Sequence, residues 1–195
     1  MEARRDEQDR GEQILAAAER LILETGTPSI SLNEIAAQVG VSRSLLYTYY
    51  DGVPQIVDAL FRRHTQRLEQ LIDARLSGAS GFRERMVALF GAYLENLVEH
   101  GPLALIVLRE RNQDSPLSEE SSRLFRRNLR GMARDVSKEL KLNPREAFVF
   151  LELLAAIPES LSRMVRDGQI RIEVALATCA RLVSEAVQAM SIEKA

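Results

Sequence analysis

Apolar residues recur at helical spacing along most of this chain, and no alternating pattern of useful length interrupts them. In the segment ILAAAERLIL, Ile14, Ala18, Leu21 and Ile22 fall on one face when the spacing is about 3.6 residues. A similar stripe runs through residues 82–97. Strands would require apolar and polar residues to alternate, so this periodicity predicts an all-α protein.

Residues that begin or end helices divide the chain into about nine helical segments. Gly26 suits the left-handed position that closes a helix, and further breaks fall at Gly40, at Asp51-Gly52 and at Gly168. New helices are expected after N-caps at four places: Ser31 with Glu34, Ser42, Ser115-Pro116 and Asn143-Pro144. Three short helices followed by longer ones predict two domains, residues 1–52 and 53–195.

Composition favours a soluble, cytoplasmic protein with no membrane association. The chain has 195 residues, of which 46% are hydrophobic and 28% charged, so it can bury a globular core. Its one cysteine, Cys179, excludes an intramolecular disulfide and fits a reducing compartment. The longest apolar stretch, residues 147–157, contains Glu152 and is much shorter than the roughly 20 residues that a membrane span needs. The charged N-terminus lacks the apolar core of a signal peptide.

Residues 31–52 fit the spacing of a helix-turn-helix motif. This motif needs a small residue where the two helices cross, glycine at the turn and apolar residues that fix the crossing angle. Ala36 supplies the small residue and Gly40 follows it by four positions. The supporting positions carry Ile35, Val39, Val41, Leu46 and Tyr49. The pattern predicts a small nucleic-acid-binding module at the start of the chain.

The segment SLNEIAAQVGVSRSLLYTYYDG resembles the DNA-binding signature of the TetR/AcrR transcriptional regulators. ILAAAERLILETG is similar to the first helix of that family, and RDGQIR to the stretch before its last helix. The motif covers about the first quarter of the chain, and the rest agrees in layout only. The resemblance implies a homodimer that binds a palindromic operator in double-stranded DNA. It also implies a C-terminal body that binds a small-molecule effector and releases the DNA, as a repressor does.

The resemblance also assigns roles to residues near the turn. Tyr47 and Tyr49 are expected to reach phosphate oxygens, and Ser31 and Ser42 to present helix N-termini to the DNA backbone. Arg43, Ser44 and Thr48 are expected to face base edges in the major groove. Leu46 and Tyr50 are expected in the core, whereas Tyr49 fits either a packing or a DNA-contacting role.

Charge is the main departure from the family pattern. Val53 stands where the family usually has a lysine that meets a phosphate. Residues 1–52 carry five arginines and nine acids, a balance of −4 that opposes the usual electrostatic attraction to DNA. Arg4, Arg5 and Arg10 could compensate as an arm. The alternative is a helical ligand-binding dimer that has lost or weakened operator binding.

The C-terminal body offers apolar residues from several helices for an effector cavity. The candidate lining comprises Phe61, His64, Met86, Phe90, Tyr93, Leu103, Ile106, Val107, Phe125, Leu129 and Met132. Their composition predicts a mainly apolar ligand, and a filled core is the alternative. Glu152 fits either a pocket wall or, preferably, a polar stripe with Arg145, Glu159 and Arg163.

The last two helices are expected to form a dimer interface with their symmetry mates. The eighth is apolar on most sides and the ninth is rich in small residues that allow close packing. The predicted interface comprises Phe148, Leu151, Cys179, Leu182, Val183 and Ala186.

Nothing in the sequence predicts catalysis, a metal site or a cofactor. His64 and His100 are the only histidines, and neither lies at metal-ligand spacing from a second ligand. Cys179 lies among alanines at helical spacing, which favours a buried structural role. The chain also lacks a phosphate-binding loop and a nucleophilic serine elbow. We therefore expect a protein that is not an enzyme.

Overall fold

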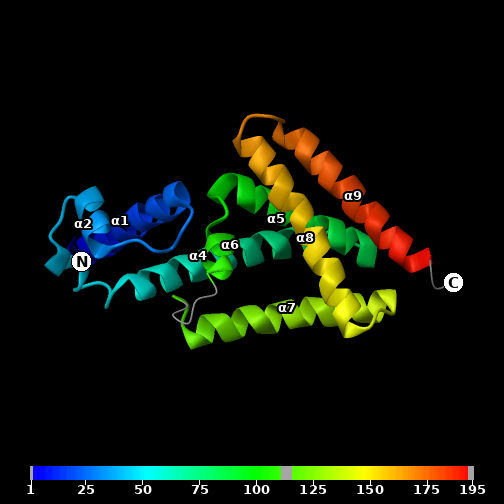
Figure 1. Cartoon of the computed structure of the whole chain (residues 1–195), viewed down its shortest axis with the longest axis horizontal. Helices are drawn as coiled ribbons and strands as arrows, with labels where there is room; N and C mark the ends of the chain where they lie inside the picture. Colours follow the sequence, from blue (N-terminus) through cyan, green and yellow to red (C-terminus); the bar gives the residue numbers. More distant parts are fainter. Residues whose placement is uncertain (1, 111–115, 193–195) are drawn as a thin grey trace. The chain divides into compact units, whose positions relative to one another are not determined.

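The computed structural model describes residues 2–110 and 116–192, which form nine α-helices and no strand (Figure 1). The helices are α1 (Glu2–Thr25), α2 (Leu32–Val39), α3 (Arg43–Leu46), α4 (Val53–Leu76), α5 (Phe82–His100), α6 (Leu103–Arg109), α7 (Glu119–Leu140), α8 (Pro144–Arg166) and α9 (Ile172–Ile192). The predicted all-α class and helix count are confirmed.

The chain separates into two compact units. Unit 1 comprises Met1–Thr65 and Pro102–Arg123, and unit 2 comprises Gln66–Gly101 and Leu124–Ala195. The divisions fall inside α4 and inside α7. The predicted boundary between residues 52 and 53 separates a DNA-binding domain from a ligand-binding domain. It is defined by function and not by compactness, so it stays a prediction.

Unit 1 is assembled around α1. This helix contacts α2 and α6, and α2 contacts α3. Large apolar side chains from five helices are buried in the unit, among them Ile14, Ile22, Ile35, Leu46, Ile56, Leu60, Phe61, Leu103 and Val107. Burial of these apolar side chains is what holds α3, a helix of four residues, in place, because so short a helix has almost no stability of its own.

The turn between α2 and α3 follows from a few local residues. Gly40 has φ 74° and ψ 34°, the left-handed conformation that glycine adopts without strain. Its N–H donates to the Ala36 carbonyl oxygen over 2.9 Å and so ends α2. Ser31 and Glu34 form the predicted capping box at the other end of α2. The helix end at Gly40 and the capping box at Ser31 were both predicted from the sequence.

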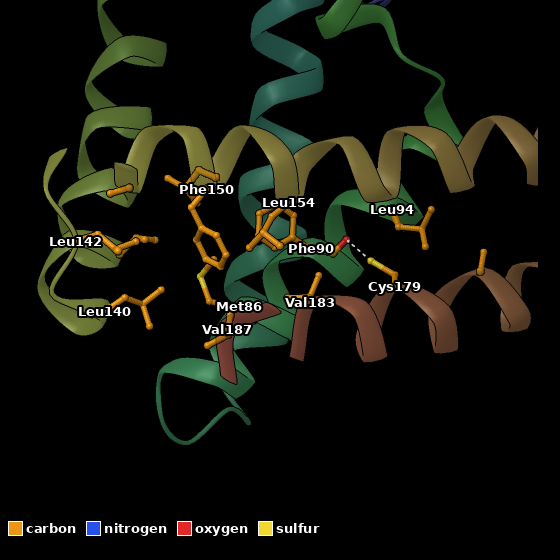
Figure 2. Close-up of a cluster of buried hydrophobic side chains, with 14 residues drawn as sticks. Met86, Phe90, Leu94, Leu140, Leu142, Phe150, Leu154, Cys179, Val183 and Val187 are labelled. Atoms are coloured by element: carbon orange, nitrogen blue, oxygen red, sulfur yellow. Dashed lines mark hydrogen bonds between the residues drawn. The ribbon is translucent and has the colours of Figure 1, made fainter. Parts of the chain in front are cut away.

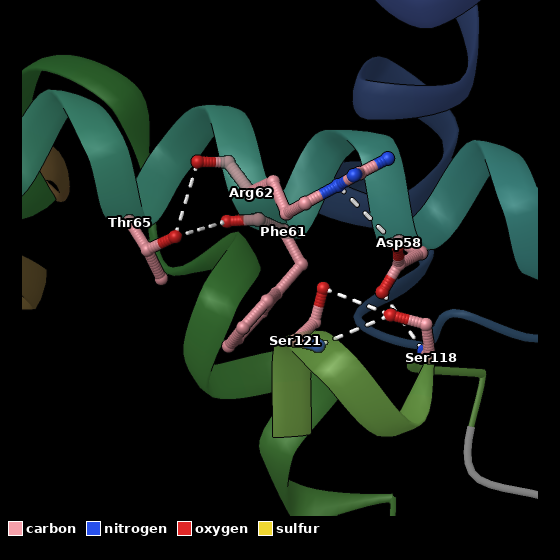
Figure 3. Close-up of polar contacts among 6 residues, drawn as sticks. All are labelled: Asp58, Phe61, Arg62, Thr65, Ser118 and Ser121. Atoms are coloured by element: carbon pink, nitrogen blue, oxygen red, sulfur yellow. Dashed lines mark hydrogen bonds and ion pairs between the residues drawn. The ribbon is translucent and has the colours of Figure 1, made fainter. Parts of the chain in front are cut away.

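A buried carboxylate of α4 caps α7 within unit 1 (Figure 3). The Ser118 N–H donates to Asp58 Oδ1 over 2.9 Å, and the Ser118 hydroxyl oxygen accepts from the Ser121 N–H over 3.1 Å. α7 therefore begins at Glu119 rather than directly after Ser115-Pro116, and Ser115 lies outside the described residues. The sequence pattern missed this start because half of the cap comes from a residue 60 positions away.

Unit 2 has its own apolar core, built where α5, α8 and α9 contact one another (Figure 2). Met86, Phe90 and Leu94 of α5 meet Phe150 and Leu154 of α8 in this cluster. The α9 side chains in it are Ala175, Cys179, Val183 and Val187. The predicted N-cap of α8 is present: the Asn143 side chain accepts from the N–H groups of Arg145 and Glu146, over 3.0 Å each.

Candidate nucleic-acid interface

The α3 segment of unit 1 presents a row of polar side chains. Ser42, Arg43, Ser44 and Thr48 are exposed, and Tyr47 exposes 47% of its surface. Leu46 of the same helix is fully buried, as predicted. Tyr49 and Tyr50 are half-buried. The residues expected to face base edges are therefore all accessible, and Leu46 anchors this segment to the core.

Arg43 and Tyr47 contact each other across one turn of this surface. Arg43 Nη2 donates to the Tyr47 hydroxyl oxygen over 2.9 Å. The guanidinium carbon also lies 5.6 Å from the centre of the Tyr47 ring, within cation–π range. Sequence reasoning gave these two residues separate roles and missed their pairing, although their spacing of four residues on a helix is the signal for it.

Besides that of Tyr47, three of the predicted DNA-contacting hydroxyls already have partners in the protein. Ser31 donates to Glu34 Oε2 through both its N–H (2.8 Å) and its hydroxyl (2.6 Å). The Ser42 hydroxyl oxygen accepts from the Leu45 N–H over 3.3 Å. The Thr48 hydroxyl donates to the Leu45 carbonyl oxygen over 2.6 Å. Thr48 and Ser31 would have to exchange these bonds to donate to DNA.

Glu34 also places a negative charge beside Ser31. Hydrogen bonds from the Ser31 side chain and then from its backbone lower the pKa of the Glu34 carboxyl below the usual 4.5. The carboxylate is therefore ionised at neutral pH and would oppose a phosphate at this end of α2. Of the predicted backbone contacts, Ser31 is the least suited in the observed arrangement.

Two acids in residues 1–52 have basic partners on α4. Arg63 Nη2 lies 2.8 Å from Glu12 Oε2, and His64 Nε2 lies 2.8 Å from Glu19 Oε1. Burial, and then the charge of Glu12, raise the pKa of the nearby Tyr50 hydroxyl. Arg63, which lies outside residues 1–52, therefore offsets the charge of Glu12 in the balance of −4. Of the proposed basic arm, Arg10 donates to Gln13 Oε1 over 3.0 Å, and the side chains of Arg4 and Arg5 lie outside the described residues.

The predicted effector-pocket residues are divided between the units. Unit 1 holds Phe61, His64, Leu103, Ile106 and Val107, and unit 2 holds Met86, Phe90, Tyr93, Phe125, Leu129 and Met132. Met86 and Phe90 belong to the packed core of unit 2. Buried His64 is hydrogen-bonded to Glu19 of α1, and the Tyr93 hydroxyl donates to Glu159 Oε1 over 3.3 Å. Glu152, on the preferred polar stripe, is exposed.

A hollow of about 390 Å³ on unit 2 involves none of these residues. It is lined by Arg75, Gly78, Ala79, Arg83, Glu84, Val87, Ala88 and Ser184. Its two arginines have protein partners, because Arg75 pairs with Glu95 and Arg83 donates to Gln188. The sequence gave no signal for it, since its residues come from α4, α5, α9 and a loop and are far apart in the chain.

The predicted dimer-interface residues fall into two groups. Phe148 and Leu182 are 45% and 48% exposed. Leu151, Cys179 and Val183 lie in the core of unit 2, and Ala186 is half-buried. Burial raises the pKa of the Cys179 thiol to about 11. Two exposed apolar residues of α8, Val149 and Leu153, were not predicted.

The described residues contain no group of three or more histidine, cysteine or acidic side chains placed to hold a metal ion. None of the helices in residues 2–110 and 116–192 combines the length and apolar character that crossing a membrane requires.

Residues 14–60, from α1 to α4, match the sequence profile of the bacterial regulatory proteins of the tetR family. The likeness to this family therefore rests on the N-terminal helices that contain the helix-turn-helix segment. An uncharacterized HTH-type transcriptional regulator of Mycobacterium tuberculosis is 34% identical over 93 residues, which is 48% of this chain and 46% of the relative. The alignment thus spans about half the length of that relative. The HTH-type transcriptional repressor NemR of Escherichia coli is 27% identical over 145 residues, 72% of this chain and 71% of NemR.

Solved structures share the fold. A TetR-like transcriptional regulator from Rhodococcus sp. RHA1 superposes with a TM-score of 0.66 at 20% identity, covering 92% of this chain and 93% of the other. A TetR family transcription regulator from Marinobacter aquaeolei VT8 gives a TM-score of 0.67 at 17% identity, covering 94% and 97%. At these identities the likeness establishes the TetR-like fold of the chain.

Proposed function

We propose that this protein is a DNA-binding transcriptional regulator of the TetR family that binds a palindromic operator as a homodimer. The observation that carries the proposal is the α2–turn–α3 segment. Gly40 closes α2 in the left-handed conformation, buried Leu46 fixes α3, and the exposed face carries Arg43, Ser44 and Thr48. A helix held in this way can enter the major groove with its polar face toward base edges.

Backbone contacts would surround this reading surface. The Tyr47 hydroxyl is accessible and can donate to a phosphate oxygen, and half-buried Tyr49, two residues further along, can do the same. Ser42, as N-cap of α3, and Ser31, as N-cap of α2, complete the proposed set. Such contacts set the register of the protein on DNA, whereas the base-edge contacts supply sequence preference.

Selection of bound sequences from random duplex DNA tests the proposal. The expected result is a two-fold symmetric site, because a symmetric dimer reads two half-sites in opposite orientation. Arg43→Ala is the variant to compare with the unchanged protein. It removes the only cation of residues 31–52, and because Arg43 is exposed, the fold should persist. Enrichment of the same sequences by this variant and by the unchanged protein would contradict the assigned role of α3.

We also propose that α8 and α9 form the dimer interface. Phe148, Val149 and Leu153 of α8 and Leu182 of α9 are exposed apolar side chains, and covering them by a symmetry mate would bury an otherwise hydrated surface. Leu151, Cys179 and Val183 would support that surface from the core. Light scattering at micromolar concentration should give the mass of a dimer, and a monomer would refute the proposal.

The proposed effector is a small, mainly apolar molecule whose binding releases the DNA. The candidate pocket residues are mostly apolar, and ligands of such sites bind by burial and shape. A repressor role is supported by the likeness to the repressor NemR, which aligns over 72% of this chain. The transcriptional activator FasR of Mycolicibacterium smegmatis aligns over 47% of this chain. Apolar effectors should raise the melting temperature by mass action and weaken DNA binding. Stabilisation by small, highly charged metabolites alone would contradict this ligand class.

A helical ligand-binding dimer with little or no operator affinity is the second candidate. The specific observation that favours it is the charge of residues 1–52, with five arginines, nine acids and Val53 at the usual lysine position. The selection experiment separates the two: enrichment of no sequence at low salt would support this second function.

A further inference from the structure

Arg43 and Tyr47 are joined by two interactions on the exposed face of unit 1. The guanidinium donates to the Tyr47 hydroxyl oxygen over 2.9 Å and lies 5.6 Å from the ring centre. Both side chains are exposed, so their arrangement is not imposed by core packing. The pair is therefore held together by its own hydrogen bond and cation–π contact, at the surface proposed to meet DNA.

Base reading in this segment depends heavily on Arg43. It is the only lysine or arginine in residues 31–52. The exposed hydroxyls of Ser44 and Thr48 can each donate or accept, so they discriminate weakly between bases. An arginine can instead make two parallel hydrogen bonds to O6 and N7 of guanine, the commonest specific contact in the major groove.

The Tyr47 contact leaves Arg43 able to make that bidentate contact. A guanidinium has five N–H donors in a rigid fork, and the bond to Tyr47 uses one of them. An arginine free of such contacts would have to lose its rotamer freedom when it binds a base. A guanidinium already stacked on a ring and hydrogen-bonded to its hydroxyl loses less, because it is held before binding.

We infer that Arg43 and Tyr47 form one recognition unit for a guanine–cytosine base pair, in which Tyr47 is a positioning residue for Arg43. The inference rests on the proposed DNA-binding function and deepens it by naming the base pair and the residue that orients the reader. The Tyr47 hydroxyl accepts from Arg43, so its own hydrogen stays available for a phosphate oxygen. Tyr47 can thus link the base contact to the backbone contact.

The test measures affinities of the full-length protein for its selected operator and for operators with each base pair replaced in turn. Arg43→Lys should lower the preference for guanine at one position of each half-site by roughly 5- to 100-fold, because lysine keeps the charge and loses the planar fork. Tyr47→Leu should lower the preference at that same position. Tyr47→Phe, which keeps the ring and loses the hydroxyl, should have an intermediate effect.

Two controls separate positioning from a general loss of grip. In the Arg43→Lys background, Tyr47→Leu should change the guanine preference no further, since residues that act as a unit are not additive. Tyr50→Phe makes the same chemical change as Tyr47→Phe at a neighbouring tyrosine outside the proposed interface, and it should leave every base preference unchanged. Far-UV circular dichroism and melting curves establish that each variant is folded.

The outcomes distinguish the inference from the function beneath it. If Tyr47→Leu weakens all duplexes by the same factor and leaves the guanine preference intact, Tyr47 only grips phosphate, and the inference fails while operator binding stands. The inference also fails if the two substitutions act on different positions. If the unchanged protein shows no sequence preference at low salt, the proposed function fails and the inference falls with it.

Discussion

The exposed faces of α3 in unit 1 and of α8 in unit 2 differ in how directly the sequence shows them. Around α3, the expected reading residues are polar and exposed while Leu46 is buried. On α8, adjacent leucines have opposite environments: Leu154 is 2% exposed in the core, and Leu153 is 65% exposed. The exposure of a polar residue can be predicted from its chemistry alone. An apolar residue on a helix that is apolar on several sides can face a core or a partner.

The difference teaches that hydrophobicity locates a buried face only when the helix has one apolar stripe. α8 and α9 carry more apolar residues than the core of unit 2 can cover, and Phe148, Val149, Leu153, Val174 and Leu182 remain exposed. We expect a second protein surface to cover this excess, because large exposed apolar patches commonly mark association sites.

The largest predicted effect tests this contrast on α8. Leu154→Ala should lower the free energy of unfolding by about 2–5 kcal/mol, because it leaves a cavity in the packed core of unit 2. Leu153→Ala is the matched control and should change the stability of the isolated chain by less than about 0.5 kcal/mol. Chemical denaturation measures both changes.

The same pair should behave differently in association. Leu153→Ala should shift the monomer–dimer equilibrium toward monomer in sedimentation, if α8 lies in the interface. Stability should also be compared at a concentration that favours the monomer. If Leu153→Ala and Leu154→Ala then lose the same folding stability, Leu153 is not more exposed than Leu154 in the monomer.

The next effect concerns a contact that the sequence pattern did not reveal. Asp58→Ala removes the buried carboxylate that accepts the Ser118 N–H and pairs with Arg62 over 3.4 Å. Hydrogen bonds to charged groups contribute about 1.5–3 kcal/mol, so unit 1 should lose stability of this order. Asp58→Asn keeps an acceptor oxygen and should lose less. Melting curves of the two variants that coincide would indicate that the ion pair with Arg62, and not the cap, stabilises this region.

The fold was largely predictable because its signals are local. Gly40, Ser31 with Glu34, and Asn143 with Glu146 act within a few residues of one another, and each occupies its predicted position. The cap of α7 by Asp58 was not predictable, because it joins residues far apart in the chain. The same limit applies to the pairs Glu12–Arg63 and Glu19–His64, which join residues of α1 to residues of α4.

The candidate sites were predictable to a different extent. A motif of fixed spacing singled out Ser42, Arg43 and Thr48, which are exposed, and their contacts with DNA stay a prediction. No comparable spacing rule exists for pocket residues. Apolar residues such as Met86 and Phe90 satisfy a ligand lining and a filled core equally well, and they lie in a packed cluster.

The helix caps at Asn143 and Ser31 provide a test with a smaller expected effect, one in each unit. Asn143→Ala removes the side-chain acceptor for two N–H groups at the start of α8 and should cost about 0.5–2 kcal/mol. Ser31→Ala at the start of α2 should additionally change the dependence of stability on pH. Because the folded pKa of Glu34 lies below 4.5, its stabilising contribution is present above pH 4.5 and is lost as the pH falls through the folded pKa.

Ser31→Ala should therefore flatten the acid limb of the stability curve, since Glu34 then loses the hydrogen bond from the Ser31 hydroxyl. Thermal melts between pH 3 and pH 7 measure this. An unchanged acid limb would show that the backbone N–H of Ser31 alone maintains the Glu34 carboxylate.

The smallest predicted effect concerns the salt dependence of operator binding, and it tests whether the polar surface of unit 1 needs cations at all. Log affinity falls with log salt by about 0.9 for each phosphate that a cation neutralises. With Arg43 as the single cation of residues 31–52 and valine at position 53, we expect a shallow slope, equivalent to roughly two to four cationic contacts per dimer rather than the 6–10 of strongly basic proteins.

Val53→Lys introduces the charge usual in the TetR/AcrR family and should tighten binding and steepen the slope by about one unit per subunit. Val53→Gln is the uncharged control and should leave the slope unchanged. A steep slope in the unchanged protein would mean that cations outside residues 31–52, such as Arg4, Arg5 and Arg10, carry much of the contact with DNA, and uncharged donors such as Tyr47 and Tyr49 would then contribute less than we propose.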